Sequence, residues 1–432
     1  FSRKNVSPGT KAARTNEFIM IPAGDELFGS IIDPLGNPMS ASKPFKKPKD
    51  SIDIEGELKS IAYRARIKKN LVTGTTLVDM LIPIGVGQRE LIIGDRKTGK
   101  TAFLYTIVKK QVQDGAIVIV AAIGKKQTDI KHMYEVYEKD GLLKQMVIVA
   151  SGSDSSPALT FLTPFSAMAL AEYYRDRGRD VFLILDDLST HAKFYRELSL
   201  IAGGFPGKDA YPGDMFHLHA RLLERAGNFT IKDGEAAISC FPVVETVDGE
   251  LAGHIATNVM GVTDGHIFFD VNAYTKGRRP AIHIGLSVSR VGRQTQSNLE
   301  REIGREIIKF FAQYERVLTF SHFGAELSTK VKNMIKKGDV LYELFDQHYA
   351  MIVPKEIQLI MFGLIWLDTF AEVDLIEIGK IRNAFIVAFQ DKKKKKLFDD
   401  IIKADTIYNL LTNISNKKEE LMSYAQPQVS QK

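Results

Sequence analysis

The stretch Arg89-Glu-Leu-Ile-Ile-Gly-Asp-Arg-Lys-Thr-Gly-Lys-Thr101 organises this chain. Its second half, from Gly94 to Thr101, matches the pattern Gly-x-x-x-x-Gly-Lys-Ser/Thr, and the apolar residues before it are typical of a buried strand. A loop of this kind binds phosphate because its backbone N–H groups converge on the phosphate oxygens. A side chain at Gly94 or Gly99 would obstruct that approach.

The residues after the loop predict a magnesium-bound nucleotide. Lys100 supplies a cation for the outer phosphates, and Thr101 supplies the hydroxyl that would hold Mg²⁺. Residues 102–111 are expected to form a helix whose N-terminus faces the same anion. We therefore predict ATP or ADP with Mg²⁺ as the ligand. The predicted binding residues are Gly94, Asp95, Arg96, Lys97, Thr98, Gly99, Lys100 and Thr101.

The composition is that of an ordinary globular protein. The 432 residues are 44% hydrophobic and 25% charged, and 58 basic residues against 52 acidic ones give a net charge of +6. This mild excess does not predict nucleic-acid binding. The sequence contains no apolar run of about 18 residues, the length that a membrane-spanning helix needs. The single cysteine, Cys240, lies in an apolar run and is expected to be a core residue.

The hydrophobic pattern predicts an α/β fold with a mostly parallel sheet and helices on both faces. After Thr295 the strand pattern stops and a helical C-terminal domain is expected. The predicted strands cover residues 91–93, 117–122, 146–150, 181–185, 237–243 and 281–286, with short strands before them around 18–21 and 27–32. The predicted C-terminal helices cover 298–317, 325–337, 339–345, 355–367 and 375–389.

Two adjacent carboxylates end one of the predicted strands. Val181 to Leu185 is apolar and is followed by Asp186 and Asp187, about 85 residues after the phosphate loop. An aspartate in this position can orient the water shell of Mg²⁺. We predict Asp186 as the residue that faces the metal through water, and Asp187 as its structural partner.

Several segments, in this order, resemble the alpha subunit of the F-type rotary ATP synthase, the non-catalytic partner in its alternating six-subunit head. The resemblance covers about residues 14–390 and implies a RecA-like phosphate-loop domain. It is carried by the residues 83–96, by Asp186-Asp187-Leu188-Ser189, by Ala210-Tyr211-Pro212-Gly213-Asp214, by His219-Ala220-Arg221-Leu222-Leu223-Glu224-Arg225-Ala226 and by the residues 280–292.

The resemblance assigns further site residues. Arg290 falls on the arginine finger of the family, which crosses the subunit interface and stabilises the γ-phosphate held by the adjacent beta subunit. Arg279 and Pro280 fall near the adenine of the non-catalytic site, with Gln347 beside it. The family usually has a second glutamine two places later, where this chain has Tyr349.

The chain departs from the family at the position that decides catalysis. Catalytic beta-type subunits carry a glutamate after the glycine of the strand-end loop, and alpha subunits carry a glutamine, whereas this chain has Gly124-Lys125. An ammonium group does not accept a proton from water at neutral pH, so hydrolysis at this chain's own site should be poor.

Two further departures concern the N-terminal segment and the loop at 203–206. Of the N-terminal six-stranded barrel of the family only the last piece, around 18–21, is recognisable, and the loop at 203–206 reads Gly-Gly-Phe-Pro and lacks two charges expected on a shaft-facing surface. Together with a sequence rich in Lys, Ile and Phe, these losses resemble those of a divergent paralogue from a small AT-rich genome such as that of a mycoplasma. The expected domains are a barrel remnant over 1–22, a RecA-like domain over 23–296, a helical domain over 297–422 and a disordered tail over 423–432.

The sequence thus predicts a nucleotide-binding, non-catalytic alpha-type subunit of a hetero-hexameric ATPase. Its expected partners are a catalytic beta-type subunit and a central-stalk subunit. It would reach the membrane only through the complex, in the cytoplasm or on the inner face of the cell membrane. Two alternatives remain open, namely a self-sufficient catalytic hexamer of the secretion type, which would need a carboxylate at position 125, and a ring-shaped RNA translocase, which expects an RNA-binding barrel with exposed aromatics.

Overall fold

The centre of the molecule is a mostly parallel β-sheet. The computed structural model describes residues 9, 11, 13–39, 45–205, 207–321 and 329–425. The strand order is β13-β12-β6-β11-β9-β7-β8-β2, with β10 paired to β11. The strands are β2 (Ser30–Ile32), β6 (Glu90–Asp95), β7 (Ile117–Lys125), β8 (Met146–Gly152), β9 (Val181–Asp186), β10 (Gly227–Ile231), β11 (Gly234–Thr246), β12 (Gly265–Phe269) and β13 (Val288–Ser289).

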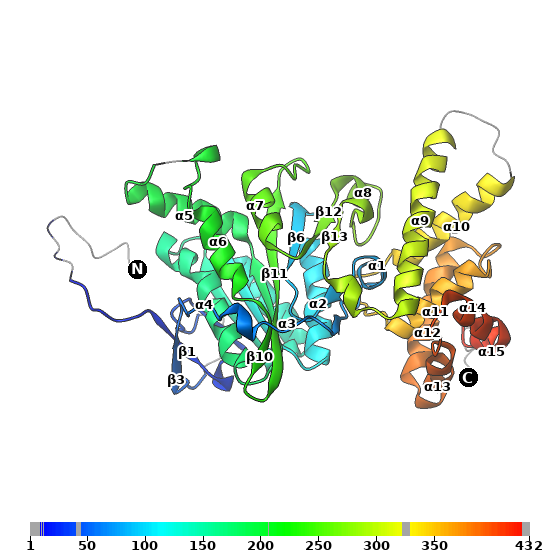
Figure 1. Ribbon diagram of the computed structural model, residues 1–432, viewed down its shortest axis with the longest axis horizontal. Coiled ribbons are helices and arrows are strands. Elements are labelled where there is room, and N and C mark those ends of the chain that lie inside the picture. The colour runs from blue at the N-terminus through cyan, green and yellow to red at the C-terminus, as the bar shows by residue number, and fades with distance from the viewer. Residues whose placement is uncertain are drawn as a thin grey trace.

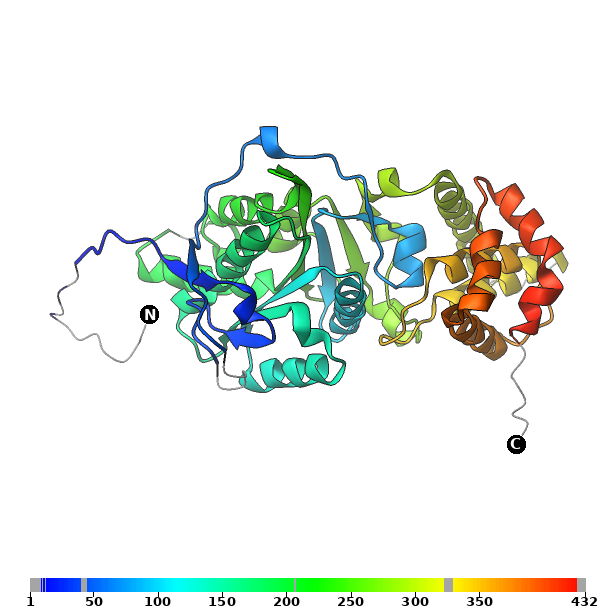
Figure 2. The ribbon, with the colours of Figure 1, turned by 90° about the horizontal axis from the view of Figure 1, so that it is seen from below.

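Strands β12, β6, β11, β9, β7, β8 and β2 run parallel, so their carboxyl ends meet at one edge. Connections between parallel strands have to cross a face of the sheet, and here most of them are helices (Figure 2). These helices are α1 (Thr76–Leu81), α2 (Lys100–Gln113), α3 (Gln127–Lys139), α4 (Pro157–Arg175), α5 (Leu188–Ile201), α6 (Met215–Glu224) and α7 (His254–Val262). The short helix α8 (Val271–Thr275) lies between β12 and β13, which pair antiparallel.

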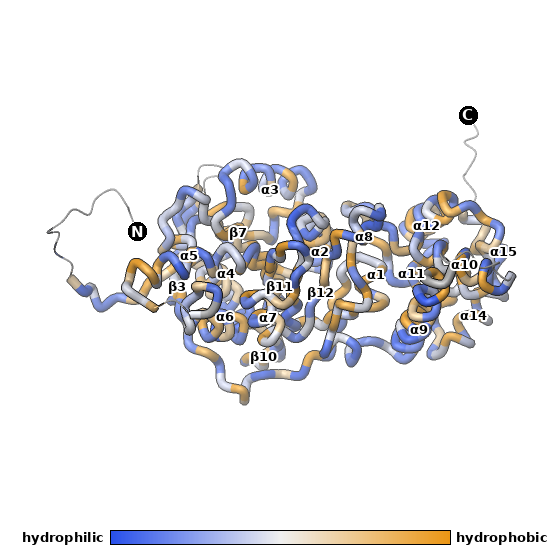
Figure 3. The backbone as a smooth tube through the Cα atoms, turned by 90° about the horizontal axis from the view of Figure 1, so that it is seen from above, coloured by the Kyte–Doolittle hydropathy of each residue, from blue (hydrophilic) through white to orange (hydrophobic). Residues whose placement is uncertain are grey.

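Alternate strand residues build two hydrophobic cores, one on each face of the sheet. Ile92, Val118 and Ile148 belong to one core, while their neighbours Leu91 and Val147 belong to the other. Both sets are fully buried, which explains why these strands are apolar throughout rather than alternating. The surface helix α3 buries only three residues and is mostly hydrophilic (Figure 3).

The structure confirms the predicted fold class and most of the predicted strands. The strand expected over 281–286 is wrong, because there the chain makes a single bridge, Ile282 to Phe269, and then a 3₁₀ turn over Ile284–Leu286. The side chain of His283 accepts a hydrogen bond from the Leu286 backbone N–H at 3.1 Å and holds this turn. The neighbouring sheet position is occupied by β12, which the pattern did not predict.

A helical domain follows at the side of the sheet that carries α1 (Figure 1). One of the two cores continues into it without interruption. Its helices are α9 (Asn298–Ser321), α10 (Thr329–Phe345), α11 (Lys355–Trp366), α12 (Leu375–Gln390), α13 (Lys392–Ile401), α14 (Ile407–Asn416) and α15 (Lys418–Ser423). Among the described helices, none is both long and apolar enough to cross a membrane.

The predicted break between two helices at Gly338 is wrong, because α10 runs through it. Gly338 packs directly against the ring of Tyr314 on α9, so the glycine serves a close contact between helices rather than ending one. The lysine run at 392–396 starts α13, whose N-terminus is capped by Asp391. Residues 325–328 of the predicted helix, Pro206 of the loop at 203–206 and residues 426–432 of the predicted tail lie outside the described residues.

Two small ribbons complete the chain. β1 (Met20–Ala23) pairs antiparallel with β3 (Asp50–Asp53), and β4 (Asn70–Leu71) pairs with β5 (Ile84–Gly85). Strand β2 lies between β1 and β3 in the sequence but is not part of their ribbon. It pairs with β8 at the edge of the main sheet. The predicted barrel remnant therefore contributes a strand to a ribbon whose other strand comes from the residues assigned to the next domain.

Candidate nucleotide site

The phosphate loop joins β6 to α2 at the carboxyl edge of the sheet. Gly99 adopts a left-handed conformation with φ 97°, as does Lys97 with φ 62°. At Gly94, with φ 151°, a Cβ atom would overlap with the backbone oxygen of Phe269 on β12, so no side chain fits. The loop thus has the strand, the glycines and the following helix that phosphate binding at a helix N-terminus requires.

Lys100 opens α2 and points back over its own loop. Its ammonium donates to the backbone oxygens of Gly94 and Asp95 at 2.7 and 2.6 Å. Burial lowers the pKa of Lys100, and the nearby carboxylates of Glu245, Asp186 and Asp187 act in the opposite direction. The ammonium is therefore held beside the loop and within the field of acidic groups from β9 and β11.

Asp186 and Asp187 follow β9 at the same edge and carry different contacts. Asp187 caps α5 by accepting from the Thr190 backbone N–H at 2.6 Å, which is the structural part expected of it. Both carboxylates also face Lys125 from the neighbouring strand β7. The Lys125 ammonium lies 2.8 Å from Asp186 Oδ1 and 3.2 Å from Asp187 Oδ2.

This ion triad fixes the charge of Lys125. Burial disfavours its ammonium, but the two aspartates outweigh burial and raise the pKa of Lys125 above its ordinary value. The side chain is thus a cation at neutral pH. An ammonium group does not accept a proton from water.

A cavity of about 290 Å³ opens beside the loop, near the lower end of the range for small-ligand pockets. Thr98, Gly99 and Ala102 form its phosphate-loop side. Arg279 and Pro280, from the segment after α8, lie on the sheet-domain side, and Gln347 comes from the segment after α10. The structure thus brings these three sequence-predicted residues together around one hollow.

The walls of this cavity also contain residues that the pattern did not predict. Tyr274, His348 and Tyr349 line it, and Tyr349 stands where the family usually has a glutamine. The guanidinium of Arg279 lies 3.8 Å from the ring centre of Tyr274, and the rings of His348 and Tyr349 are 4.4 Å apart. Aromatic faces of this kind suit a flat base, but no spacing signal in the sequence singles out Tyr274 or His348.

Gln347 is held by the protein itself. Its Nε2 donates to the backbone oxygens of Gly74 and Met351, and its Oε1 accepts from the N–H and the hydroxyl of Thr76. Both N–H donors and both acceptor lone pairs of the Gln347 amide are therefore used within the protein. The contribution of Gln347 to the cavity is its position, which ties the helical domain to α1.

Arg290 lies outside this cavity, just after β13. Its backbone N–H donates to the Asp264 oxygen at 3.0 Å, while its guanidinium is exposed and contacts the backbone oxygens of Thr263 and Met260 only at 3.5 and 3.4 Å. Burial raises the pKa of the nearby Glu90 carboxyl, and the Arg290 guanidinium acts in the opposite direction, so a charge attraction adds to these two long contacts.

The fit of the predicted Mg²⁺ site is partial. The side chain of Thr101 is exposed at the start of α2, so its hydroxyl is accessible to a metal on the phosphates. The Asp186 carboxylate, however, is already paired with the Lys125 ammonium. Within the described residues, no group of three or more His, Cys, Asp or Glu side chains could hold a metal ion by itself.

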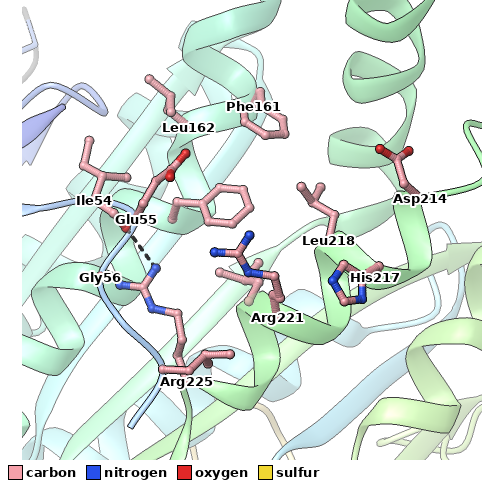
Figure 4. A pocket seen from close by; sticks show the side chains of 13 residues that line it. Ile54, Glu55, Gly56, Phe161, Leu162, Asp214, His217, Leu218, Arg221 and Arg225 are labelled. Atoms are coloured by element: carbon pink, nitrogen blue, oxygen red, sulfur yellow. Dashed lines mark hydrogen bonds between the residues drawn. The ribbon is translucent and has the colours of Figure 1, made fainter. Parts of the chain in front are cut away.

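A second hollow, of about 200 Å³, lies away from the loop (Figure 4). Phe161, Leu162 and Leu218 form apolar walls, and Arg221 points into it. Arg225 at its base is already bound to Glu172 and to the Ile54 oxygen. This hollow shares no lining residue with the phosphate loop.

The sheet is mostly parallel, with a phosphate loop after β6 and two aspartates at the end of β9, and β11 lies between these two strands. Together with a base-sized cavity beside a helical domain, this arrangement defines a phosphate-loop nucleotide-binding protein. The chain belongs to the ATP synthase alpha/beta family. The model of that family's nucleotide-binding domain matches residues 74–289, and the model of the C-terminal domain of its alpha and beta subunits matches residues 296–420.

Within the family the chain is similar to alpha subunits. It is 39% identical over 359 residues to the ATP synthase subunit alpha of Dictyoglomus turgidum, covering 83% of this chain and 70% of that protein. The alpha subunits of Neorickettsia sennetsu and Clostridium acetobutylicum are 35% and 34% identical. These two matches cover 92% and 93% of this chain and 81% of each relative.

Proposed function

We propose that this chain is the non-catalytic, nucleotide-binding alpha-type subunit of a hetero-hexameric F-type-like ATPase. The observation that carries the proposal is the Lys125 ammonium between Asp186 and Asp187, at the strand end where catalysis needs a carboxylate. A loop that binds phosphate is thus combined with a neighbouring residue that cannot activate water. The similarity to proteins named ATP synthase subunit alpha supports the same assignment.

The nucleotide in this proposal is ATP or ADP. Its phosphates would lie against the loop from Gly94 to Thr101, with Lys100 as the cation. Its adenine would enter the cavity lined by Arg279, Pro280 and Gln347. Mg²⁺ carried by the nucleotide would meet the Thr101 hydroxyl, whereas water-mediated contact with Asp186 would compete with the ion pair to Lys125.

Arg290 is the residue that acts on a neighbouring chain in this proposal. Its exposed guanidinium would reach the γ-phosphate held by a beta-type subunit and stabilise the charge that develops there. The geometry supports this because the chain's own contacts to the guanidinium are long.

The assembly follows from the same proposal. The partners are a catalytic beta-type subunit in an alternating hexamer and a central-stalk subunit, with no nucleic acid and with membrane contact only through the complex. The chain would then act in the cytoplasm or on the inner face of the cell membrane. The domain limits at 22, 296 and 422 remain our proposal for how the chain divides.

The test combines binding and turnover on the purified chain. We expect the chain to bind ATP and to turn it over more slowly than about 1 s⁻¹, the lower end of usual enzyme rates. Lys100→Ala should weaken ATP binding, because it removes the cation beside the loop. This variant is the control that shows whether ATP binds at the predicted site. Faster steady turnover by the isolated wild type would show that the site is catalytic and contradict the proposal.

The two alternatives make different demands. A self-sufficient catalytic hexamer needs a carboxylate at position 125, and the chain has a paired lysine there. An RNA translocase should bind labelled single-stranded RNA with an affinity that falls steeply as salt rises. Mixing the purified chain with such RNA distinguishes that alternative, and we expect no salt-sensitive binding.

A further inference from the structure

Lys125 places a fixed positive charge where the predicted metal shell would lie. It reaches from the end of β7 to Asp186 at the end of β9, its direct neighbour in the sheet, and bridges to Asp187 as well. The side chain is about three-quarters buried, so solvent screens these contacts less than it would on an open surface.

The balance of charge around the phosphate position depends on this residue. Glu245 is paired with Arg96 at 2.7 Å, and Asp95 of the loop accepts hydrogen bonds from the Thr246 hydroxyl and the Gly249 N–H. Asp186 and Asp187 are the two carboxylates that face Lys125 directly. Lys100 and Lys125 supply one positive charge each, so the four groups are neutral together without any metal ion. With an uncharged residue at position 125, the remaining three charged side chains would carry a net charge of −1. They would then repel a phosphate unless a divalent cation were added.

The metal itself would meet a disfavoured environment. A divalent cation whose water shell contacts Asp186 would approach the carboxylate that already carries the Lys125 ammonium at 2.8 Å. Two cations on one carboxylate repel each other, and displacing the lysine would leave a mostly buried ammonium without its partners. The donor set therefore fits a built-in ammonium better than it fits the Mg²⁺ shell predicted from the sequence.

We infer that Lys125 takes the place of magnesium at Asp186, so that this site binds the phosphate chain of ATP or ADP without requiring a divalent cation. The inference rests on the proposed function, because it concerns the same nucleotide site. It assigns Lys125 as a residue that determines the metal dependence of binding, with Lys100 as the second cation on the phosphates.

The experiment measures the dissociation constant of radiolabelled ATP by equilibrium dialysis, on nucleotide-free protein, in excess Mg²⁺ and in EDTA. For the wild type we expect the two constants to agree within about threefold, since the ammonium replaces the metal charge. In Lys125→Gln the constant in EDTA should exceed that in Mg²⁺ by at least about tenfold, because one buried charge beside the phosphates is lost.

Lys126→Gln is the matched control. Lys126 is the next residue, is exposed and makes no ion pair within the described part of the chain, so its removal changes net charge equally but leaves the triad intact. The ratio of the two constants should then stay at the wild-type value. If Lys125→Gln does not fold, as judged by circular dichroism, Lys125→Met, which also removes the charge, takes its place in the same comparison.

The outcomes separate the two claims. Wild-type binding that is tight in Mg²⁺ and lost in EDTA would overturn the inference and leave the proposed nucleotide site standing. A wild-type ratio near one that Lys125→Gln does not change would also overturn it, because the independence from metal would then have another source. Absence of ATP binding under both conditions would instead contradict the proposed function.

Discussion

Arg290 is the residue whose substitution should separate binding from catalysis. A guanidinium delivered from a neighbouring chain contributes about 10³ to 10⁵ in rate, or roughly 4 to 7 kcal/mol of barrier. We expect Arg290→Ala to lose that factor in the ATPase rate of the complex with a beta-type subunit, while ATP binding to the isolated chain stays near normal. Arg290→Lys should lose most of it, because a compact ammonium lacks the planar fork.

The matched control is Arg293→Ala, which removes an exposed arginine three residues away. The complex with that variant should keep its rate. Full ATPase activity in Arg290→Ala would remove the finger assignment. Lost ATP binding in the isolated Arg290→Ala chain would show that Arg290 serves its own site.

Single residues could be predicted only where their task is set by local sequence. The phosphate loop is contiguous, so its glycines, Lys100 and Thr101 follow from the pattern alone. Lys125 is visible in the sequence as a departure, but its partner Asp186 is 61 residues away and meets it only because β7 and β9 are neighbours in the sheet. Tyr274 and His348 were missed for the same reason, since these two residues of the cavity wall come from different domains, whereas Tyr349 was visible in the sequence as a departure from the family.

At the scale of elements, α9 and α10 depend on a close contact at Gly338. A methyl group there would overlap with the ring of Tyr314, which is buried and donates to Asp339 at 2.8 Å, so the ring cannot easily move. We expect Gly338→Ala to destabilise the chain by about 1 to 3 kcal/mol, despite the better helix propensity of alanine. Urea unfolding of wild type and variant measures this difference.

Gly261→Ala is the matched control, because Gly261 is also helical and a methyl group on it would meet no atom within 4 Å among the described residues. It should leave stability unchanged or raise it by up to about 1 kcal/mol. Equal effects of the two substitutions would show that the contact between α9 and α10 does not limit stability.

The helices α5 and α6 are joined by a buried histidine pair. His191 Nδ1 lies 3.0 Å from His219 Nε2, and burial lowers the pKa of His191 to about 4 and that of His219 to about 3. Unfolded histidine has a pKa near 6.5, so the unfolded chain takes up protons first as the pH falls. We expect stability to decrease below pH 6.5, by up to about 3 kcal/mol for His191 alone at pH 4.

Urea midpoints measured between pH 7 and pH 4 check this dependence. His219→Gln should reduce the loss, because one buried titrating group is removed and the amide can still bond to His191. His217→Gln, at an exposed histidine on the same helix, should leave the dependence unchanged. A wild-type slope identical to that of His219→Gln would contradict the assignment.

Helices and strands were predicted well where a long run of apolar residues indicates the same element. They were predicted poorly where a few specific contacts determine the backbone conformation. The buried strands from β6 to β9 follow from continuous apolar runs. At the β13 edge of the sheet the prediction was wrong. The 3₁₀ turn held by His283 replaces the strand expected over 281–286, and the short strand β12 lies between β6 and β13. Likewise Gly338 is a helix stop by propensity, and only the neighbouring helix shows why it is a packing site.

For the whole molecule, the cavity beside the phosphate loop lies where the sheet domain and the helical domain meet. Gln347 binds Gly74 and Thr76, and the Val353 backbone N–H donates to the Gly74 oxygen at 3.2 Å. Thr106 on α2, five residues after Thr101 at the end of the phosphate loop, donates to the Tyr349 oxygen. A nucleotide in this cavity would therefore contact both domains and hold them in one orientation.

The proposed division of labour makes each kind of subunit incomplete without the other. In this proposal the chain has the paired Lys125 instead of a base at its own phosphate site, and its exposed Arg290 acts on the phosphate of a neighbour. In an alternating hexamer every catalytic site would need one arginine from one alpha-type neighbour, so each beta-type chain would require one copy of this chain.

We expect the ATPase rate of a fixed amount of beta-type subunit to rise as this chain is added and to level off at equal amounts. Light scattering should give the mass of a hexamer at that ratio. Arg290→Ala should form the same hexamer and give almost no rise in rate. A rate that levels off at another ratio, or a beta-type subunit equally active alone, would contradict the alternating assembly and the role of this chain in it.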